Sequence, residues 1–278
     1  MYFGRSLPAL AFFCCFGILC AQTDQDTLHK TPFTIGESVI LHSHTLNENR
    51  ILNIYLPLGY SKDPVKTYPV IYLLDGSADE DFIHISGLVQ FCSFQWLQII
   101  PESIVVGIAN VDRQRDFTFP AKNAENLRNH PTSGGSMNFI RFLSSEVQPF
   151  IEEHYRTNST TTLIGQSLGG LLATEILFSQ PDLFDNYIIV SPSLWWDDES
   201  LLEAVPIPYA SLKSIYVAVG SEGPIMEREA RGLYEKLNQD PHENTTLFFH
   251  FMEAQNHADA LHLAVYDAFE KIFKSQQD

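Results

Sequence analysis

Short apolar runs alternate along the chain with longer segments in which apolar residues recur every three or four positions. The short runs, several of them rich in Val and Ile, are typical of buried strands, and the longer segments are typical of helices that bury one face. Strands are predicted at residues 37–44, 50–57, 69–74, 103–109, 161–164, 187–190, 214–219 and 247–251, and helices at 139–153, 168–179, 227–237 and 258–273.

Strands that alternate with helices predict an α/β fold, with a mostly parallel central sheet and helices on both of its faces. Turn-forming residues 46–49 separate the first two strands, so we expect an antiparallel hairpin at the start of the sheet. Residues 22–278 contain no repeat, low-complexity tract or linker, and we predict a single domain there. Residues 113–136, rich in Asn, Pro and Gly, predict a long loop at the mouth of a site.

The N-terminus has the pattern of a secretory signal peptide. Arg5 precedes an apolar run at residues 7–20, and the small residue Ala21 is followed by polar residues. The run is short for a membrane-spanning helix. We therefore predict a signal peptide at residues 1–21, export, and no stable membrane insertion after cleavage. An uncleaved anchor is the alternative, and Leu19 argues against a lipid anchor on Cys20.

The composition narrows the class of partner and cofactor. A formal net charge of −17 disfavours nucleic acid and anionic membrane surfaces as partners. His42 and His44 alternate on one strand face but have no evident third ligand, so we expect no metal, and no other cofactor is indicated. Cleavage would leave Cys92 as the one cysteine, in an apolar stretch that predicts a buried, unreactive thiol.

Residues 165–169, Gly-Gln-Ser-Leu-Gly, form a G-x-S-x-G pentapeptide between a predicted strand and a predicted helix. Strand, sharp turn and helix are the context of a nucleophile elbow, which exposes the serine hydroxyl on a strained turn. The helix N-terminus then directs its free N–H groups and positive dipole end at the reacting atoms. Ser167 is the predicted nucleophile.

A serine nucleophile needs a histidine base oriented by a carboxylate, and in this fold class the acid and then the histidine follow the serine on later loops. His257 lies in the polar loop after the last strand and is the predicted base. Glu222 follows the strand at 214–219 and is the predicted acid. The alternatives that stay open are His250 and His262 for the base, and Asp197, Asp198 and Glu227 for the acid.

The oxyanion of a tetrahedral intermediate needs two donors, which we expect to be the N–H of Leu168 and an N–H of the loop at 74–77. Gly76 in that loop would let the backbone approach the substrate closely, and a plain turn is the alternative. Arg115, in the predicted mouth loop, and Trp195 are the predicted substrate contacts. The alternatives are a surface salt bridge for Arg115 and its neighbours Arg113 and Asp116, and packing under a loop for Trp195 and Trp196.

Five motifs follow one another from residue 68 onward. They are residues 68–76 (YPVIYLLDG), 107–110 (GIAN) with 113–119, 163–170 (LIGQSLGG), 191–196 (SPSLWW) and Asn256-His257. The ordered set resembles the Putative esterase family of the α/β-hydrolase superfamily, which includes esterase D-like enzymes and esterases that open ferric siderophores such as enterobactin. The resemblance implies an α/β-hydrolase fold with Ser167 as nucleophile, His257 as base and Glu222 as acid.

The chain departs from the family pattern at Gln166, where many members have histidine, and at residues 220–222, which are shorter than the common Gly-x-x-Asp. We expect an exported serine esterase that hydrolyses a small-molecule carboxylic ester through an acyl-enzyme. An acyltransferase of the same fold and a non-catalytic, hydrolase-like binding protein are the alternatives, because a fold does not fix a function.

Overall fold

The computed structural model describes residues 1–2, 4, 30–239 and 244–274. The chain divides into two units, Met1–Phe33 and Thr34–Asp278, and the fold presented below is that of the second. The apolar run and cleavage site of the predicted signal peptide, residues 1–21, lie outside the described residues. Across the described part of the chain, no helix has both the length and the apolar character that crossing a membrane requires.

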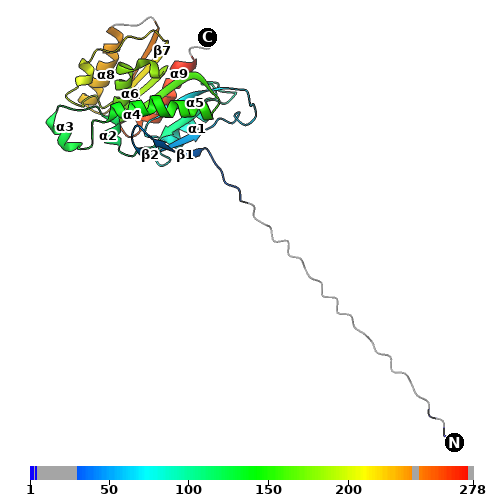
Figure 1. Cartoon of the computed structure of the whole chain (residues 1–278). Helices are drawn as coiled ribbons and strands as arrows, with labels where there is room; N and C mark the ends of the chain where they lie inside the picture. Colours follow the sequence, from blue (N-terminus) through cyan, green and yellow to red (C-terminus); the bar gives the residue numbers. More distant parts are fainter. Residues whose placement is uncertain (3, 5–29, 240–243, 275–278) are drawn as a thin grey trace. The chain divides into compact units, whose positions relative to one another are not determined.

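The described strands form one eight-stranded sheet in the order β1-β2-β4-β3-β5-β6-β7-β8. Figure 1 labels β1, β2 and β7 of this sheet. Their bounds are β1 Glu37–Ser43, β2 Glu48–Tyr55, β3 Tyr68–Leu73, β4 Ile104–Ile108, β5 Thr157–Gln166, β6 Asn186–Val190, β7 Lys213–Gly220 and β8 Thr245–Met252. β1 pairs antiparallel with β2, and β2 with β4, whereas all other neighbours pair in parallel. The predicted α/β-hydrolase fold, with a mostly parallel sheet and an antiparallel N-terminal hairpin, is confirmed.

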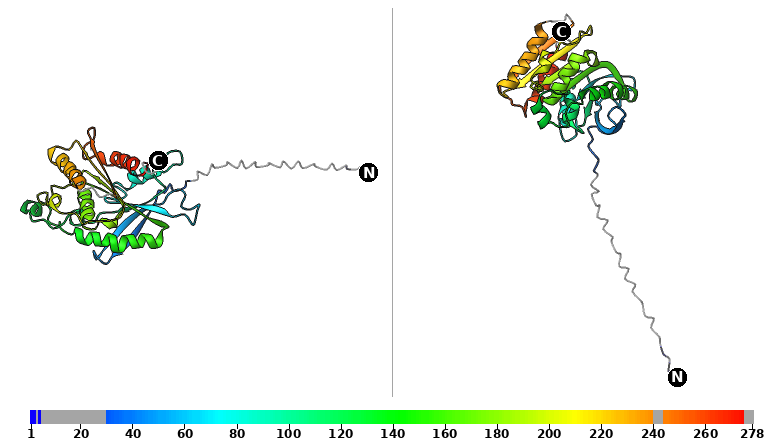
Figure 2. Two further views of the ribbon diagram at one scale, coloured as in Figure 1. Left: turned by 90° about the horizontal axis from the view of Figure 1, so that it is seen from above. Right: turned by 60° about the vertical axis from the view of Figure 1, so that its left-hand side comes forward.

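Helices cover both faces of this sheet, and the two groups lie on opposite sides of it in Figure 2. One face carries α4 (Ser136–Phe142), α5 (Gln148–His154), α6 (Leu168–Ser179) and α8 (Pro224–Gln239), and the other carries α1 (Phe82–Cys92) and α9 (Ala260–Phe273). Successive strand residues supply the two layers, since Leu163 packs in the first core cluster and Ile164 in the second. The parallel strands are therefore apolar on both sides, as their continuous hydrophobic runs predict.

Two segments differ from the sequence expectation. α1 was not predicted, because its β-branched and aromatic residues and Gly87 have weak helix propensity. Burial of one face of α1, against the sheet and α9, stabilises this helix. The predicted loop at 113–136 instead contains α2 (Arg113–Phe117) and α3 (Ala124–Asn129), each capped by a side chain at its N-terminus.

The remaining helical segments are short. The predicted helix at 139–153 is longer than expected, since α4 continues through a π-helical turn, Leu143–Val147, into α5. The structure also has a 3₁₀ turn at Pro181–Leu183 and the four-residue helix α7 (Ser200–Glu203).

The strand order creates a crevice at the carboxyl ends of the central strands. From β3 the chain proceeds to β4 on one side and then crosses to β5 on the other. The loops after β3 and β5 therefore leave the sheet in different directions, and ligands of open α/β sheets bind at such a point. The Ser167 turn follows β5 at this end of the sheet.

Candidate active site

Ser167 forms the turn between β5 and α6 with φ 58° and ψ −121°, a region that costs a non-glycine residue about 1–3 kcal/mol. The turn is held in place because the N–H of Ser167 donates to the carbonyl of Val190 at 3.1 Å. A Cβ at Gly165 would lie 2.3 Å from the carbonyl oxygen of Gly169, so the glycine is required where strand and helix meet. The serine Oγ lies 3.3 Å from Oγ of Ser193.

His257 and Glu222 are joined by a hydrogen bond of 2.6 Å between Nδ1 and Oε2. The Glu222 side chain is 3% exposed and that of His257 is 48% exposed. Oε1 of Glu222 accepts from Oγ of Ser191 and, at 3.0 Å, from the N–H of Gly220. Burial raises the pKa of Glu222, but hydrogen bonds from His257, Ser191 and Gly220 outweigh it and hold the pKa below its usual range. An ionised Glu222 keeps the proton of the neutral imidazole on Nδ1 and leaves Nε2 as an acceptor.

The alternative acids have other partners. Asp197 accepts the N–H of Asn123 at 2.8 Å, and Asp198 accepts the Asn123 side chain at 2.7 Å, so both organise the start of α3. Glu227 accepts the N–H of Glu222 at 3.1 Å and thereby supports the loop that carries Glu222. Of the open candidates, Glu222 is the carboxylate hydrogen bonded to His257.

The alternative bases also lie outside the lining of the cavity that contains Ser167. Nδ1 of His250 is 2.8 Å from a carboxylate oxygen of Asp267. The ring of His262 contacts the ring of His84, with 4.7 Å between centroids. These contacts connect strand β8 and helix α1 with α9, and they give both histidines a structural role.

The predicted oxyanion donors have different outcomes. Leu168 is the first residue of α6, so its N–H has no acceptor within the helix. The N–H of Gly76, the other predicted donor, is already paired in this structure, since it donates to the carbonyl of Ile108 at 3.0 Å. A Cβ at Gly76 would lie 2.3 Å from Cα of Gly107, so Gly76 is required for close packing on β4.

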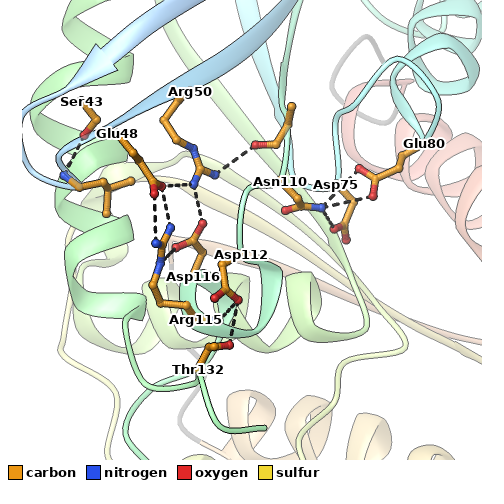
Figure 3. A network of polar contacts seen from close by, with 12 residues as sticks. Ser43, Glu48, Arg50, Asp75, Glu80, Asn110, Asp112, Arg115, Asp116 and Thr132 are labelled. Atoms are coloured by element: carbon orange, nitrogen blue, oxygen red, sulfur yellow. Dashed lines mark hydrogen bonds and ion pairs between the residues drawn. The ribbon is translucent and has the colours of Figure 1, made fainter.

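Arg113 lines the site and is bound to a carboxylate. Its Nε and Nη2 each donate to one oxygen of Asp75, at 2.6 and 2.8 Å. Nδ2 of Asn110 donates to Asp75 at 2.6 Å and lies 3.3 Å from an oxygen of Glu80, as the right side of Figure 3 shows. The bidentate pair neutralises the cation, so Arg113 offers little free positive charge to a substrate.

Arg115, the predicted substrate contact, lies outside the lining of the cavity that contains Ser167. Its guanidinium donates to Glu48 at 2.6 Å and to Asp116 at 2.7 Å (Figure 3). Asp116 is fully buried and also accepts from the buried Arg50 at 2.6 Å. The network fixes α2 against β2, which is the salt-bridge alternative for this residue.

Trp195 is half-buried and packs against the core on the α6 side of the sheet. Its ring contacts those of Trp196 and His130, with 6.1 Å between centroids in each case. Trp196 is fully buried and donates its ring N–H to the carbonyl of Phe119 at 2.9 Å. Trp195 does not line the cavity beside Ser167, and the contacts that the structure shows for it are those of the packing alternative.

An open cavity of about 420 Å³ brings the catalytic candidates together. Its lining consists of Asp75, Glu80, Asp81, Arg113, Gln166, Ser167, His257 and Ala258. With Arg113 paired to Asp75, the carboxylates of Glu80 and Asp81 leave this cavity with an excess of negative charge. Burial, with the charges of Asp75 and Glu80, raises the pKa of Asp81 to about 6, against the opposing effect of His84 and Arg113.

Among the residues that the structure describes, no group of three or more His, Cys, Asp or Glu side chains could hold a metal ion. Cys92 is fully buried, as predicted. Burial, with a smaller contribution from Glu270, raises the pKa of its thiol to about 11, so a reactive thiolate is strongly disfavoured.

Three polar side chains beside the site were not assigned from the sequence. Ser191 and Ser193 follow β6 and contact Glu222 and Ser167 respectively, and their position directly after a buried strand was a usable signal. Gln166 donates from Nε2 to the carbonyl of His257 at 2.6 Å. No local signal could have found that bond, because the two residues are 91 positions apart.

A serine on a strained elbow within this sheet defines a serine hydrolase of the α/β-hydrolase fold. The family model described as Putative esterase matches residues 43–258, and the chain belongs to that family. It is 30% identical over 231 residues to the ferri-bacillibactin esterase BesA of Bacillus subtilis, covering 75% of this chain and 80% of that protein.

Two solved structures extend the comparison. One is an IroE-like serine hydrolase from Shewanella oneidensis, with a TM-score of 0.77 and 30% identity, covering 86% of this chain and 80% of that one. The other is the BES protein from Bacillus cereus, with a TM-score of 0.74 and 28% identity, covering 87% of this chain and 96% of that one. The protein is therefore an enzyme, a serine hydrolase that acts on carboxylic ester bonds.

Proposed function

We propose that the protein is an exported serine esterase that hydrolyses a small-molecule carboxylic ester through an acyl-enzyme, with Ser167, His257 and Glu222 as its triad. The observation that carries the proposal is the 2.6 Å bond between Glu222 and His257, beside a cavity that both His257 and Ser167 line. A carboxylate bound to an imidazole, with a serine hydroxyl lining the same cavity, supplies the groups that acyl transfer requires.

In the first half-reaction, Oγ of Ser167 turns from Ser193 toward Nε2 of His257 and attacks the ester carbonyl carbon. Nε2 takes the hydroxyl proton, and the carboxylate of Glu222 stabilises the resulting imidazolium. His257 then gives this proton to the departing alkoxide, which releases the alcohol and leaves the acyl group on Ser167. In the second half-reaction His257 deprotonates a water that attacks the acyl carbon, the carboxylic acid leaves, and the proton returns to Oγ.

Two backbone N–H groups are proposed to hold the oxyanion. The first is that of Leu168, at the free N-terminus of α6. The second is that of Ser77, which follows the occupied Gly76 and donates to no acceptor in the part of the chain that the structure describes. A donor of this kind contributes roughly 3 kcal/mol of transition-state stabilisation.

The relatives support an ester of the siderophore type as the substrate, since one is named a ferri-bacillibactin esterase and covers most of this chain. The N-terminal sequence, with its apolar run and Ala21, supports export of the mature enzyme. Export is tested by fractionating cells that express the full chain and sequencing the N-terminus of the product. Recovery of an intact residue 1 in the cytoplasm would exclude it.

The triad is tested with wild type and Ser167→Ala on a panel of a short acyl p-nitrophenyl ester, an acetylated sugar, a feruloyl ester and a triscatecholate trilactone. Loss of a serine nucleophile removes on the order of a millionfold in kcat in a well-studied serine hydrolase. We expect no measurable turnover by Ser167→Ala, and labelling of wild type alone by a fluorophosphonate. Full activity of the alanine variant would disprove the assignment.

A further inference from the structure

Gln166 is the last residue of β5 and directly precedes the serine. Side chains of a strand alternate between its faces, so Gln166 shares a face with Ile164. Ile164 packs in the core cluster that α1 and α9 cover. The segment that carries His257 leads into α9, so the Gln166 side chain lies on the face from which the base approaches.

The contacts of Gln166 join three loops. Its Nε2 donates to the carbonyl of His257 at 2.6 Å. Its own carbonyl oxygen accepts from Nη2 of Arg113 at 3.4 Å, and Arg113 is in turn held by both oxygens of Asp75. The loops after β3 and β4 and the segment after β8 are thus connected through the residue next to the nucleophile.

The base has few other attachments. Its side chain is half-exposed, and the bond to Glu222 fixes the orientation of the ring at one atom. The segment before His257 is held by the local bond from Asn256 N–H to Asp259 at 2.6 Å and by Ser221, which donates to the carbonyls of Gln255 at 2.7 Å and Glu253 at 2.8 Å. These bonds reach the loop after β7 and not the elbow. The hydroxyl of Ser167 meets Ser193, so the hydroxyl itself does not hold the base in position. The Gln166 amide is the contact that ties the His257 backbone to the elbow.

We propose that Gln166 is a positioning residue that fixes the His257 backbone relative to Ser167 through its side-chain amide. The inference rests on the proposed function of Ser167 and His257. The placement matters because a shift of about 1 Å between reacting groups costs on the order of a hundredfold in rate. Removal of the amide donor is therefore expected to lower kcat far more than it changes KM.

The test compares three substitutions in the full chain. Gln166→Met has a similar length without a donor, Gln166→Glu has the same shape without a donor, and Gln166→His restores a ring N–H. We expect kcat to fall about ten- to a hundredfold in the first two, with KM within about twofold of wild type and a parallel fall in the rate of fluorophosphonate labelling. The histidine variant should recover a large part of kcat. Gln180→Met, an exposed position at the other end of α6, is the matched control and should behave as wild type.

Urea unfolding of every variant distinguishes a loss of positioning from a loss of stability. Because Gln166 is only partly buried, all variants should stay folded at the assay temperature. Wild-type kcat in Gln166→Met, or a histidine variant no faster than the methionine variant, overturns the inference while leaving the triad intact. Activity in Ser167→Ala overturns the proposed function and, with it, this inference.

Discussion

Replacement of Glu222 by glutamine tests the electrostatics of the site with almost no change in shape. The carboxylate accepts three hydrogen bonds, from Nδ1 of His257, from Oγ of Ser191 and from the N–H of Gly220. A glutamine has one oxygen and one amino group at the same positions. If the oxygen keeps Ser191 and Gly220 as donors, the amino group must face Nδ1 of His257.

An amino group at that position donates to Nδ1, which requires the proton of the neutral imidazole to lie on Nε2. Nε2 then cannot accept the proton of Ser167. The tautomer that could accept it has its proton on Nδ1, and that N–H would face the amino group of the glutamine, which is unfavourable because both groups are donors. The same carboxylate-to-amide change in a serine protease lowers kcat about 10⁴-fold, equivalent to about 5 kcal/mol of transition-state stabilisation. Because the Glu222 side chain is 3% exposed, little water can replace the lost charge, and we expect a loss of that order.

The assay is kcat and KM on a short acyl p-nitrophenyl ester, together with the second-order rate of fluorophosphonate labelling. KM should change little, since the substrate does not touch Glu222 in the proposed mechanism. The control is Asp198→Asn, whose exposed carboxylate contacts the Asn123 side chain and which should keep wild-type kcat. A loss below tenfold in Glu222→Gln, or a larger loss in Asp198→Asn, would refute the reasoning.

Three further outcomes are expected. Burial raises the pKa of Glu175 to about 7, so the contribution of this carboxyl to stability is present below pH 4.5 and lost as the pH rises through 7. Relative to Glu175→Gln, wild type should lose about 3 kcal/mol of unfolding free energy between these pH values, measured by urea unfolding. A difference between the two proteins that does not change with pH would contradict this expectation. Arg115→Gln should lower the unfolding free energy by about 1–3 kcal/mol, because buried Asp116 loses a charged donor. An increased KM in this variant would instead indicate the predicted contact between Arg115 and the substrate. Because the cavity has an excess of negative charge, an ester with a trimethylammonium group should have a higher kcat/KM than its uncharged tert-butyl isostere. The ratio should be about threefold for one carboxylate ~6 Å away in water. The preference should weaken with added salt and in Glu80→Gln, and equal kcat/KM values for both esters would exclude the effect.

The predicted strands succeeded because each is a local pattern. Strands such as β7 are buried on both faces of the sheet, so consecutive residues must be apolar, and a run of this kind can be recognised in the sequence. Helix α1 was not predicted for the same reason, since its residues have weak helix propensity and its stability comes from packing against α9. Patterns that extend over a few residues were readable, and stability supplied by distant partners was not.

The two arginines of α2 show how a short helix decides a role. Arg113 and Arg115 are two positions apart, so in a helix they point about 200° from one another. One lines the cavity with Asp75, and the other joins Glu48 and Asp116. A loop was expected at these residues, and a loop gives no basis for assigning different roles to the two arginines. Arg115 was therefore predicted to contact the substrate, whereas Arg113 is the one that lines the cavity.

The sequence by itself determined the sheet, the elbow at residues 165–169 and the loop that carries His257, because each is fixed by the chemistry of neighbouring residues. Only the tertiary structure decided which carboxylate reaches the imidazole, because Glu222 lies 35 positions from His257 and its rivals carry the same charge. It also decided that the N–H of Gly76 is already bonded to β4 and that the Gln166 amide donates to the carbonyl of His257. These outcomes depend on which strands become neighbours in the sheet. The partners of such hydrogen bonds are far apart in sequence, so the residues next to each partner do not indicate the bond.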